Sequence, residues 1–150
     1  MRTGGQLFAR GSIERVKGTQ DTSGAELARL REIARALDSY LERCGYEDLE
    51  VPVIEHLDLY LRKAGSAVVS RLYEFTDQGG RRLALRHEFT ASVIRAYVER
   101  GESLPQPVRW RYAGPVFRYE RPQRGRYRQH TQQGVELIGA PAPRGDAEIL

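Results

Sequence analysis

The spacing of apolar residues near the start of the chain predicts an amphipathic helix over 25–43. Within this range the apolar residues recur every three or four positions, as they do along one face of a helix. They are Leu27, Leu30, Ile33, Ala34, Leu37, Tyr40 and Leu41. Gly45 follows directly and is a typical helix stop. Residues 1–23 are polar and rich in glycine, which indicates a loop that leads into the domain.

The next pattern predicts short strands. Residues 46–54 have the composition of a strand, and Pro52, which has no N–H to donate to a ladder, is expected at an edge or a strand end. A short helix is expected over 57–63. Two further strands, 72–76 and 81–86, are separated by Asp-Gln-Gly-Gly, whose composition is typical of a hairpin turn.

The last third of the chain predicts a helix followed by a long hairpin. Residues 90–100 have helical periodicity, and strands are expected over 108–120 and 127–138, with the loop 122–125 between them. A further helix is expected to begin at Asp146. This order of elements favours an α+β fold in which an antiparallel sheet is flanked by helices. Because the last predicted helix is cut short, we expect one domain that is a fragment of a longer unit.

Composition and charge narrow the possible functions. The 150 residues include 24 basic and 20 acidic side chains, a net charge of +4. Seven arginines lie within 109–128 beside a single acid, Glu120, which indicates local anion binding or a nonspecific nucleic-acid patch. The lone Cys44 excludes an intrachain disulfide, and no Cys/His spacing predicts a zinc site. No apolar run predicts a signal peptide or a membrane span, so we expect a cytosolic protein.

The long predicted hairpin carries the candidate chemistry. Side chains alternate faces along a strand, so Arg118 and Glu120 share one side of the first strand, and Gln132, Gly134 and Glu136 share one side of the second. If the two faces coincide, a guanidinium could hold a phosphate, a carboxylate could accept from an ammonium group, and Gly134 would leave room for a ligand. The alternative is that these polar residues form an ordinary solvated face.

Several segments resemble those of the histidyl-tRNA synthetases, a class II aminoacyl-tRNA synthetase family. Residues 112–129, YAGPVFRYERPQRGRYRQ, and the QQGVE that begins at Gln132 resemble motif 2 and the strand after it, over about 108–139. The segment at about 25–54 resembles motif 1. KGTQD, beginning at Lys17, is similar to the family's entry signature. LRHEFT, beginning at Leu85, is similar to its amino-acid-binding turn, with His87 and Phe89 where proline and glycine are commoner.

This resemblance implies a role for each matching residue. Arg118 would be the catalytic arginine that contacts the α-phosphate of ATP and the histidine carboxylate, Glu120 would bind the adenine amino group, and Arg126 would bind the outer phosphates. The residues that would hold the α-amino group of histidine are Glu88, Thr90, Gln132 and Glu136. Pro52 would lie at a homodimer interface.

The resemblance also implies substrates and missing parts. The substrates would be histidine, ATP with Mg²⁺, whose ligands are expected outside this chain, and tRNA(His). Motif 3, the imidazole-reading segment and the anticodon-binding domain are absent from these 150 residues, so an incomplete site is expected. Two alternatives stay open. One is the synthetase-like regulatory subunit of ATP phosphoribosyltransferase. The other is a non-catalytic fragment that binds RNA by charge.

Overall fold

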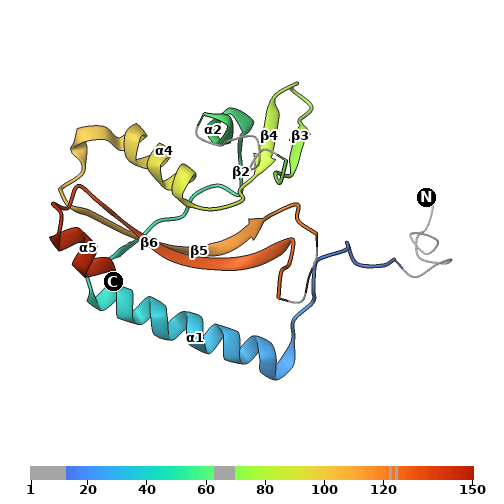
Figure 1. Cartoon of the computed structure of the whole chain (residues 1–150), viewed down its shortest axis with the longest axis horizontal. Helices are drawn as coiled ribbons and strands as arrows, with labels where there is room; N and C mark the ends of the chain where they lie inside the picture. Colours follow the sequence, from blue (N-terminus) through green and yellow to red (C-terminus); the bar gives the residue numbers. More distant parts are fainter. Residues whose placement is uncertain (1–12, 63–69, 122, 124) are drawn as a thin grey trace, which may run out of the picture.

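The computed structural model describes residues 13–62, 70–121, 123 and 125–150, and it contains two three-stranded sheets (Figure 1). The helices are α1 (Gly24–Arg43), α2 (Leu57–Leu61), α4 (Thr90–Arg100), the 3-10 turn η1 (Gly101–Ser103) and α5 (Arg144–Ile149). The strands are β1 (Glu47–Asp48), β2 (Ile54–His56), β3 (Glu74–Thr76), β4 (Arg82–Leu85), β5 (Val108–Phe117) and β6 (Gln129–Ile138). The α+β prediction is confirmed.

The first sheet is built around the long hairpin of β5 and β6, which pair antiparallel from Val108↔Ile138 to Phe117↔Gln129. On the other side of β5, β1 adds a short parallel pairing, so the sheet is not purely antiparallel. The second sheet has the order β2-β4-β3 and is antiparallel throughout. Instead of the single sheet expected, the fold therefore has two, which Figure 1 shows with the smaller one near the outer end of β5.

The strand predicted over 46–54 is wrong as a single element. Its beginning, β1, pairs with β5, whereas β2 begins only at Ile54 and pairs with β4 in the other sheet. Residues 49–53, which we name the crossing segment, join the two sheets. Leu49 and Val51 of this segment are buried, and Glu50 and Pro52 are exposed. Buried and exposed positions alternate from Leu49 to Pro52, but the hydrogen-bond partner changes along the segment.

Other predicted boundaries shift by a few residues. The strand expected over 108–120 ends at Phe117, because the N–H of Glu120 donates to the carbonyl of Arg118 and turns the chain away. The second strand begins at Gln129 rather than at residue 127, and the last helix begins at Arg144 rather than at Asp146. The expected short hairpin is confirmed as β3 and β4, with its turn held by the Asp77 carboxylate. Residue 63, the expected end of α2, and residues 122 and 124 of the long loop lie outside the described residues.

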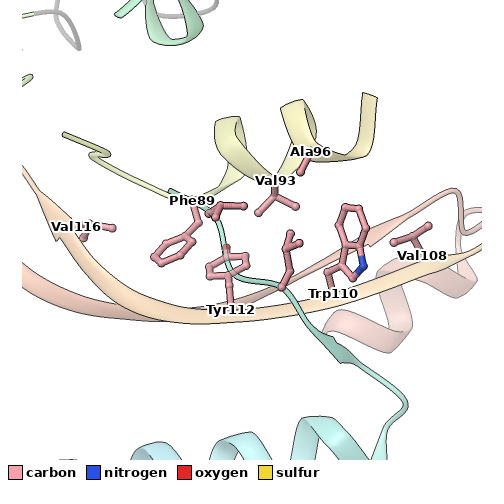
Figure 2. Packing of buried hydrophobic residues seen from close by; sticks show 9 residues of the cluster. Phe89, Val93, Ala96, Val108, Trp110, Tyr112 and Val116 are labelled. Carbon is pink, nitrogen blue, oxygen red and sulfur yellow. The ribbon is translucent and has the colours of Figure 1, made fainter. Parts of the chain in front are cut away.

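The main core lies on one face of the long hairpin. The N-cap residue of α4, Phe89, and two residues within the helix, Val93 and Ala96, pack onto β5 side chains from Val108 to Val116 (Figure 2). Leu49 and Val51 lie at the edge of this core. Phe89 stacks on Tyr112 with 4.3 Å between ring centroids and 11° between planes. A smaller cluster beneath the second sheet contains Leu57, Tyr60, Leu72 and Ala84. Among the described helices none has the length and apolar character that crossing a membrane requires.

The opposite face of the hairpin carries α1 (Figure 1), and this contact buries much less side-chain surface. No residue of α1 is buried; those half-buried against the sheet are Leu27, Ala34, Asp38 and Leu41. Arg111 of β5 anchors α1 by donating to the carbonyl of Asp38 at 3.0 Å while it pairs with Asp48 through two hydrogen bonds. Gln133 of β6 donates to the carbonyl of Ala34.

Candidate functional site

The register of the long hairpin places the predicted polar residues on one face. Gly114 lies opposite Gln132, Tyr112 opposite Gly134, and Trp110 opposite Glu136. Arg118 continues this face, because its N–H donates to the carbonyl of Arg128 one step beyond the last strand pair. The two predicted faces therefore coincide, and they coincide on the side covered by α4.

Thr90 and Glu136 form the clearest contact between predicted site residues. The Thr90 hydroxyl, at the first position of α4, donates to the Glu136 carboxylate at 2.7 Å. Glu88 lies at the start of the same helix, where its two carboxylate oxygens accept from the N–H groups of Thr90 and Ala91. A carboxylate at a helix N-terminus satisfies backbone donors that have no partner within the helix. Glu88 is thus held as a helix cap and keeps lone pairs that a ligand could use.

Gln132 adds an acceptor beside this pair. Its side-chain carbonyl oxygen is buried and accepts no hydrogen bond from the described residues. Tyr112 lies next to it, and burial, together with the charge of Glu136, raises the pKa of the Tyr112 hydroxyl. An unsatisfied buried acceptor is costly, so it marks a position at which a bound donor would be favourable.

Gly134 has a different role from the one predicted. A methyl group on Gly134 would lie 2.7 Å from the hydroxyl oxygen of Tyr112 and 2.9 Å from its ring carbons. The space over the glycine is therefore filled by the ring of its cross-strand partner, and no ligand can lie there. The prediction that Gly134 makes room for a ligand is wrong, because a large aromatic residue directly opposite a glycine folds over it.

Arg118 lies at the far end of the same face. Its Nε donates to the carbonyl of His87 at 3.0 Å, which leaves the outer nitrogens of the guanidinium available. His87 and His130 flank it. Burial, and then the positive charge of Arg118, lower the pKa of His130, and burial is also the main cause that lowers the pKa of His87. Arg118 thus presents a fixed cation beside imidazoles that favour the neutral form.

Glu120 and Arg126 lie beyond the strands. The Glu120 carboxylate pairs with Arg71 at 3.3 Å, and its backbone carbonyl accepts from Arg128. Arg126 sits in the exposed loop, where its backbone pairs with Gln123. Among the described residues, Arg126 makes no ion pair or hydrogen bond with Glu120, so the structure does not bring these predicted nucleotide residues into contact.

Sequence reasoning missed several residues that build this region. One is Tyr112, which lies beneath the site. Another is Arg86, which joins the two sheets by donating to the carbonyls of Val51 at 2.7 Å and Pro115 at 2.8 Å. Phe89, noted as unusual at its turn, belongs to the core. The alternation of aromatic residues along β5 could have indicated Tyr112, but nothing local in the sequence indicated Arg86.

A cavity of about 670 Å³ lies beside β5 and is lined from both faces of the hairpin, by Phe89 and Tyr112 on the α4 side and by Gln133 on the α1 side. It is bounded by α1, the crossing segment and β5, and Ala34, Asp38, Val51 and Pro115 are among the residues that line it. None of the predicted ligand-binding residues lines this cavity. Within the described part of the chain, no group of three or more His, Cys, Asp or Glu side chains is arranged to hold a metal ion.

Comparisons with known proteins agree on one family. Residues 18–150 match the family model described as Histidyl-tRNA synthetase. The chain is 46% identical over 138 residues to the histidine–tRNA ligase of Methanospirillum hungatei and 43% identical to that of Pyrococcus abyssi. It covers 34% and 32% of those relatives, while 92% of this chain is aligned in each case. The chain therefore spans about a third of the length of the curated relatives it matches.

Solved structures show the same likeness. The apo histidyl-tRNA synthetase of S. aureus superposes with a TM-score of 0.77 at 36% identity, covering 92% of this chain and 32% of that one. A Bacillus halodurans protein described as an ATP phosphoribosyltransferase regulatory subunit/histidyl-tRNA synthetase has a TM-score of 0.81 at 26% identity, covering 93% and 36%.

Proposed function

The chain belongs to the histidyl-tRNA synthetase family, and on that premise we propose that it forms the part of a class II catalytic core that binds the amino group of histidine and the α-phosphate of ATP. In this proposal residues 25–54 act as motif 1 and residues 108–139 as motif 2. The observation that carries the proposal is the single face that holds Thr90 hydrogen-bonded to Glu136, the buried acceptor of Gln132, and the cation of Arg118.

The amino-acid half of the proposed site is acceptor-rich. Glu88, Gln132 and Glu136 offer carboxylate and carbonyl oxygens, and an ammonium group carries three donors. The α-amino group of histidine would supply the donor that the buried oxygen of Gln132 lacks. A group without an N–H or O–H would leave the oxygen unsatisfied, and an anionic group would be repelled by the carboxylates, so the chemistry favours a cationic donor.

The nucleotide half is where the proposed reaction takes place. The histidine carboxylate attacks the α-phosphorus of ATP, the new bond joins carboxylate oxygen to phosphorus, and pyrophosphate leaves. Both reactants are anions, so the principal task of the protein is to hold them together and offset their charge. Arg118 would contact both, Glu120 would accept from the adenine amino group, and Arg126 would meet the outer phosphates. Mg²⁺ would arrive on the phosphates of ATP.

The proposed partners follow from the same premise. The activated histidine would pass to tRNA(His) in the cytosol. An isologous homodimer would form through α1 and the neighbourhood of Pro52. Apolar side chains on α1 remain 41–57% exposed; these are Leu30, Ile33, Leu37 and Tyr40. A contiguous exposed apolar surface favours association, and a two-fold dimer is the simplest closed form.

The structural neighbour described partly as a regulatory subunit supports a second candidate, a regulator without charging activity. Its likeness rests on 26% identity, whereas curated histidine–tRNA ligases reach 46%. A regulator would have no need for ATP-binding residues. ATP binding that depends on Arg118 therefore separates the two candidates.

The test is a calorimetric titration of the chain with ATP and Mg²⁺, and separately with histidine. Arg118→Ala should weaken ATP binding roughly ten- to a hundredfold, because a hydrogen bond to a charged group contributes about 1.5–3 kcal/mol. Arg31→Ala removes an exposed arginine on α1 and is the matched control. It should leave the affinity for ATP unchanged. Equal ATP affinity in the wild type and in Arg118→Ala would contradict the proposed role.

A further inference from the structure

Arg71 touches the turn that carries Glu120 in two ways. Its guanidinium Nη1 lies 3.3 Å from Glu120 Oε1, and its backbone carbonyl accepts from the N–H of Tyr119 at 2.8 Å. The ring of Tyr73, two residues later, meets the ring of Tyr119 edge-on at 5.4 Å. The approach to β3 in the small sheet therefore fixes a turn that belongs to the long hairpin.

The backbone around Arg71 is itself held in place. Leu72 is buried in the smaller cluster with Leu57, Tyr60 and Ala84. The carbonyl of Tyr73 accepts from the N–H of Leu85 at 2.9 Å, which fastens the segment to β4. Because the next two residues are anchored, and the carbonyl of Arg71 itself accepts from Tyr119, the Arg71 side chain starts from a fixed position when it reaches Glu120.

Glu120 depends on such a contact for its direction. Its backbone is set by a tight turn, in which its N–H donates to the carbonyl of Arg118, and by Arg128, whose Nε donates to its carbonyl. Neither contact fixes the carboxylate. Of the two carboxylate oxygens, Oε1 accepts from Arg71, and Oε2 makes no hydrogen bond with the described residues. Arg71 is thus the described side chain that orients this acceptor.

We propose that Arg71 is a positioning residue that gives the nucleotide site its selectivity for the exocyclic amino group of adenine. Held by Arg71 through Oε1, the Glu120 carboxylate directs Oε2 toward a donor on the base. Without Arg71 the carboxylate is free to turn toward solvent, and its preference for an amino-bearing base falls. This inference rests on the proposed function, because it assumes that ATP lies beside Glu120.

The probe pair is ATP and purine riboside 5′-triphosphate, which lacks the exocyclic amino group. The ratio of their affinities isolates the contact to the amino group and is insensitive to the phosphates. In the wild type this ratio should favour ATP. Arg71→Ala should lower it about three- to fivefold, the range expected for an exposed ion pair. Arg71→Lys should restore part of it, because a cation remains beside Oε1.

Two further variants make the result specific. Arg82→Ala removes another exposed arginine paired with a glutamate, Glu74 at 3.5 Å, in the same small sheet but away from the turn, so the ratio should not change. In a Glu120→Ala background, Arg71→Ala should have no additional effect on the ratio, because the group it orients is gone. Urea unfolding of each variant confirms that the fold is kept.

The outcomes separate the two proposals. If Glu120→Ala lowers the ratio and Arg71→Ala does not, the positioning role of Arg71 is wrong and the nucleotide site stands. If Glu120→Ala leaves the ratio unchanged while Arg118→Ala abolishes ATP binding, the adenine contact is wrong, and Arg71 has nothing to position. If ATP does not bind the wild-type chain, the proposed function of this chain fails, and the inference fails with it.

Discussion

The two faces of the β5–β6 hairpin differ in how far this chain completes them. Toward α4 the face is closed by stacked and buried side chains, and the same face carries the candidate site. Toward α1 the helix has no buried residue and leaves four large apolar side chains exposed. The same pair of strands thus carries a finished core on one side and an unfinished contact on the other. The difference indicates that packing within the chain supports the site, whereas the α1 face contributes little packing of its own, which is why the proposed dimer is placed there.

The largest expected effect separates the stability of the two faces. Phe89 is 1% exposed and stacks on Tyr112, so Phe89→Ala should lower the free energy of unfolding by about 3–5 kcal/mol. Ile33 on α1 is 57% exposed, and Ile33→Ala should change the stability of the monomer by less than about 0.5 kcal/mol. Urea unfolding at low protein concentration measures both. Similar losses in the two variants would contradict the contrast between the faces.

Self-association is expected to depend on the α1 face and not on the α4 face. Leu37→Asp places a charge in the proposed dimer surface and should weaken self-association by roughly thirtyfold, or about 2 kcal/mol, the effect of a central interface residue. Val98→Asp, at a 70% exposed position on α4, is the matched control. Sedimentation velocity over a concentration series gives both constants. A wild-type chain that stays monomeric at high concentration would refute the dimer.

A smaller effect is expected within the site. Thr90→Val removes the hydroxyl that donates to Glu136 and should weaken histidine binding by about fivefold, corresponding to roughly 1 kcal/mol. Thr131→Val makes the same change on β6 but on the face toward α1, because Thr131 directly precedes Gln132 and successive side chains of a strand point to opposite faces. Titration calorimetry should show the loss in the first variant alone. An equal loss in both would mean that the threonines act through strand stability.

The smallest expected effect concerns pH. Burial lowers the pKa of His87 and of His130, so the folded chain holds fewer protons than the unfolded chain. Their contribution to stability is complete above the unfolded value of about 6.5 and is lost as pH falls through the folded pKa values. Asp48, whose pKa the Arg111 guanidinium lowers, acts only in a more acidic window, below about 4.

Replacing the two half-buried histidines tests this dependence. His87→Gln and His130→Gln should each flatten the fall of the urea midpoint between pH 6.5 and 5. His56→Gln removes an exposed histidine at the end of β2 and should leave the slope unchanged. A slope that persists in the double variant of His87 and His130 would assign it to other groups.

The sequence predicted local elements well because their signals are local. The three-and-four spacing placed α1 within one residue, and Asp-Gln-Gly-Gly located the turn between β3 and β4. Alternation placed Gln132 and Glu136 on one side of the second strand and Arg118 on one side of the first, but only the register shows that the two sides coincide. The strand partners of the 46–54 segment could not be predicted, because a strand's hydrogen-bond partner is set by tertiary contacts that apolar spacing does not encode.

The candidate site shows the same limit. Residues already matched to family motifs were found, but Tyr112 over Gly134 required the cross-strand register. The contact between Arg71 and Glu120 joins positions 49 residues apart and has no sequence signature. Similarly, the apolar stripe on α1 indicated an amphipathic helix. It did not show that the side of α1 that packs on the sheet differs from the side that carries most of its large apolar residues.

The crossing segment also has a consequence for how the chain folds. The hairpin of β5 and β6 joins neighbours in sequence, so only a short loop must close before it can form. β1 reaches β5 across 63 residues, and β2 reaches β4 across roughly half that separation. Residues 49–53 connect β1 to β2. The two sheets are therefore complete only when β1 has paired with β5 and β2 has paired with β4. We therefore expect the hairpin and α4 to organise early and α1 to dock last, which makes the α1 face the slowest part of the molecule to reach its native state.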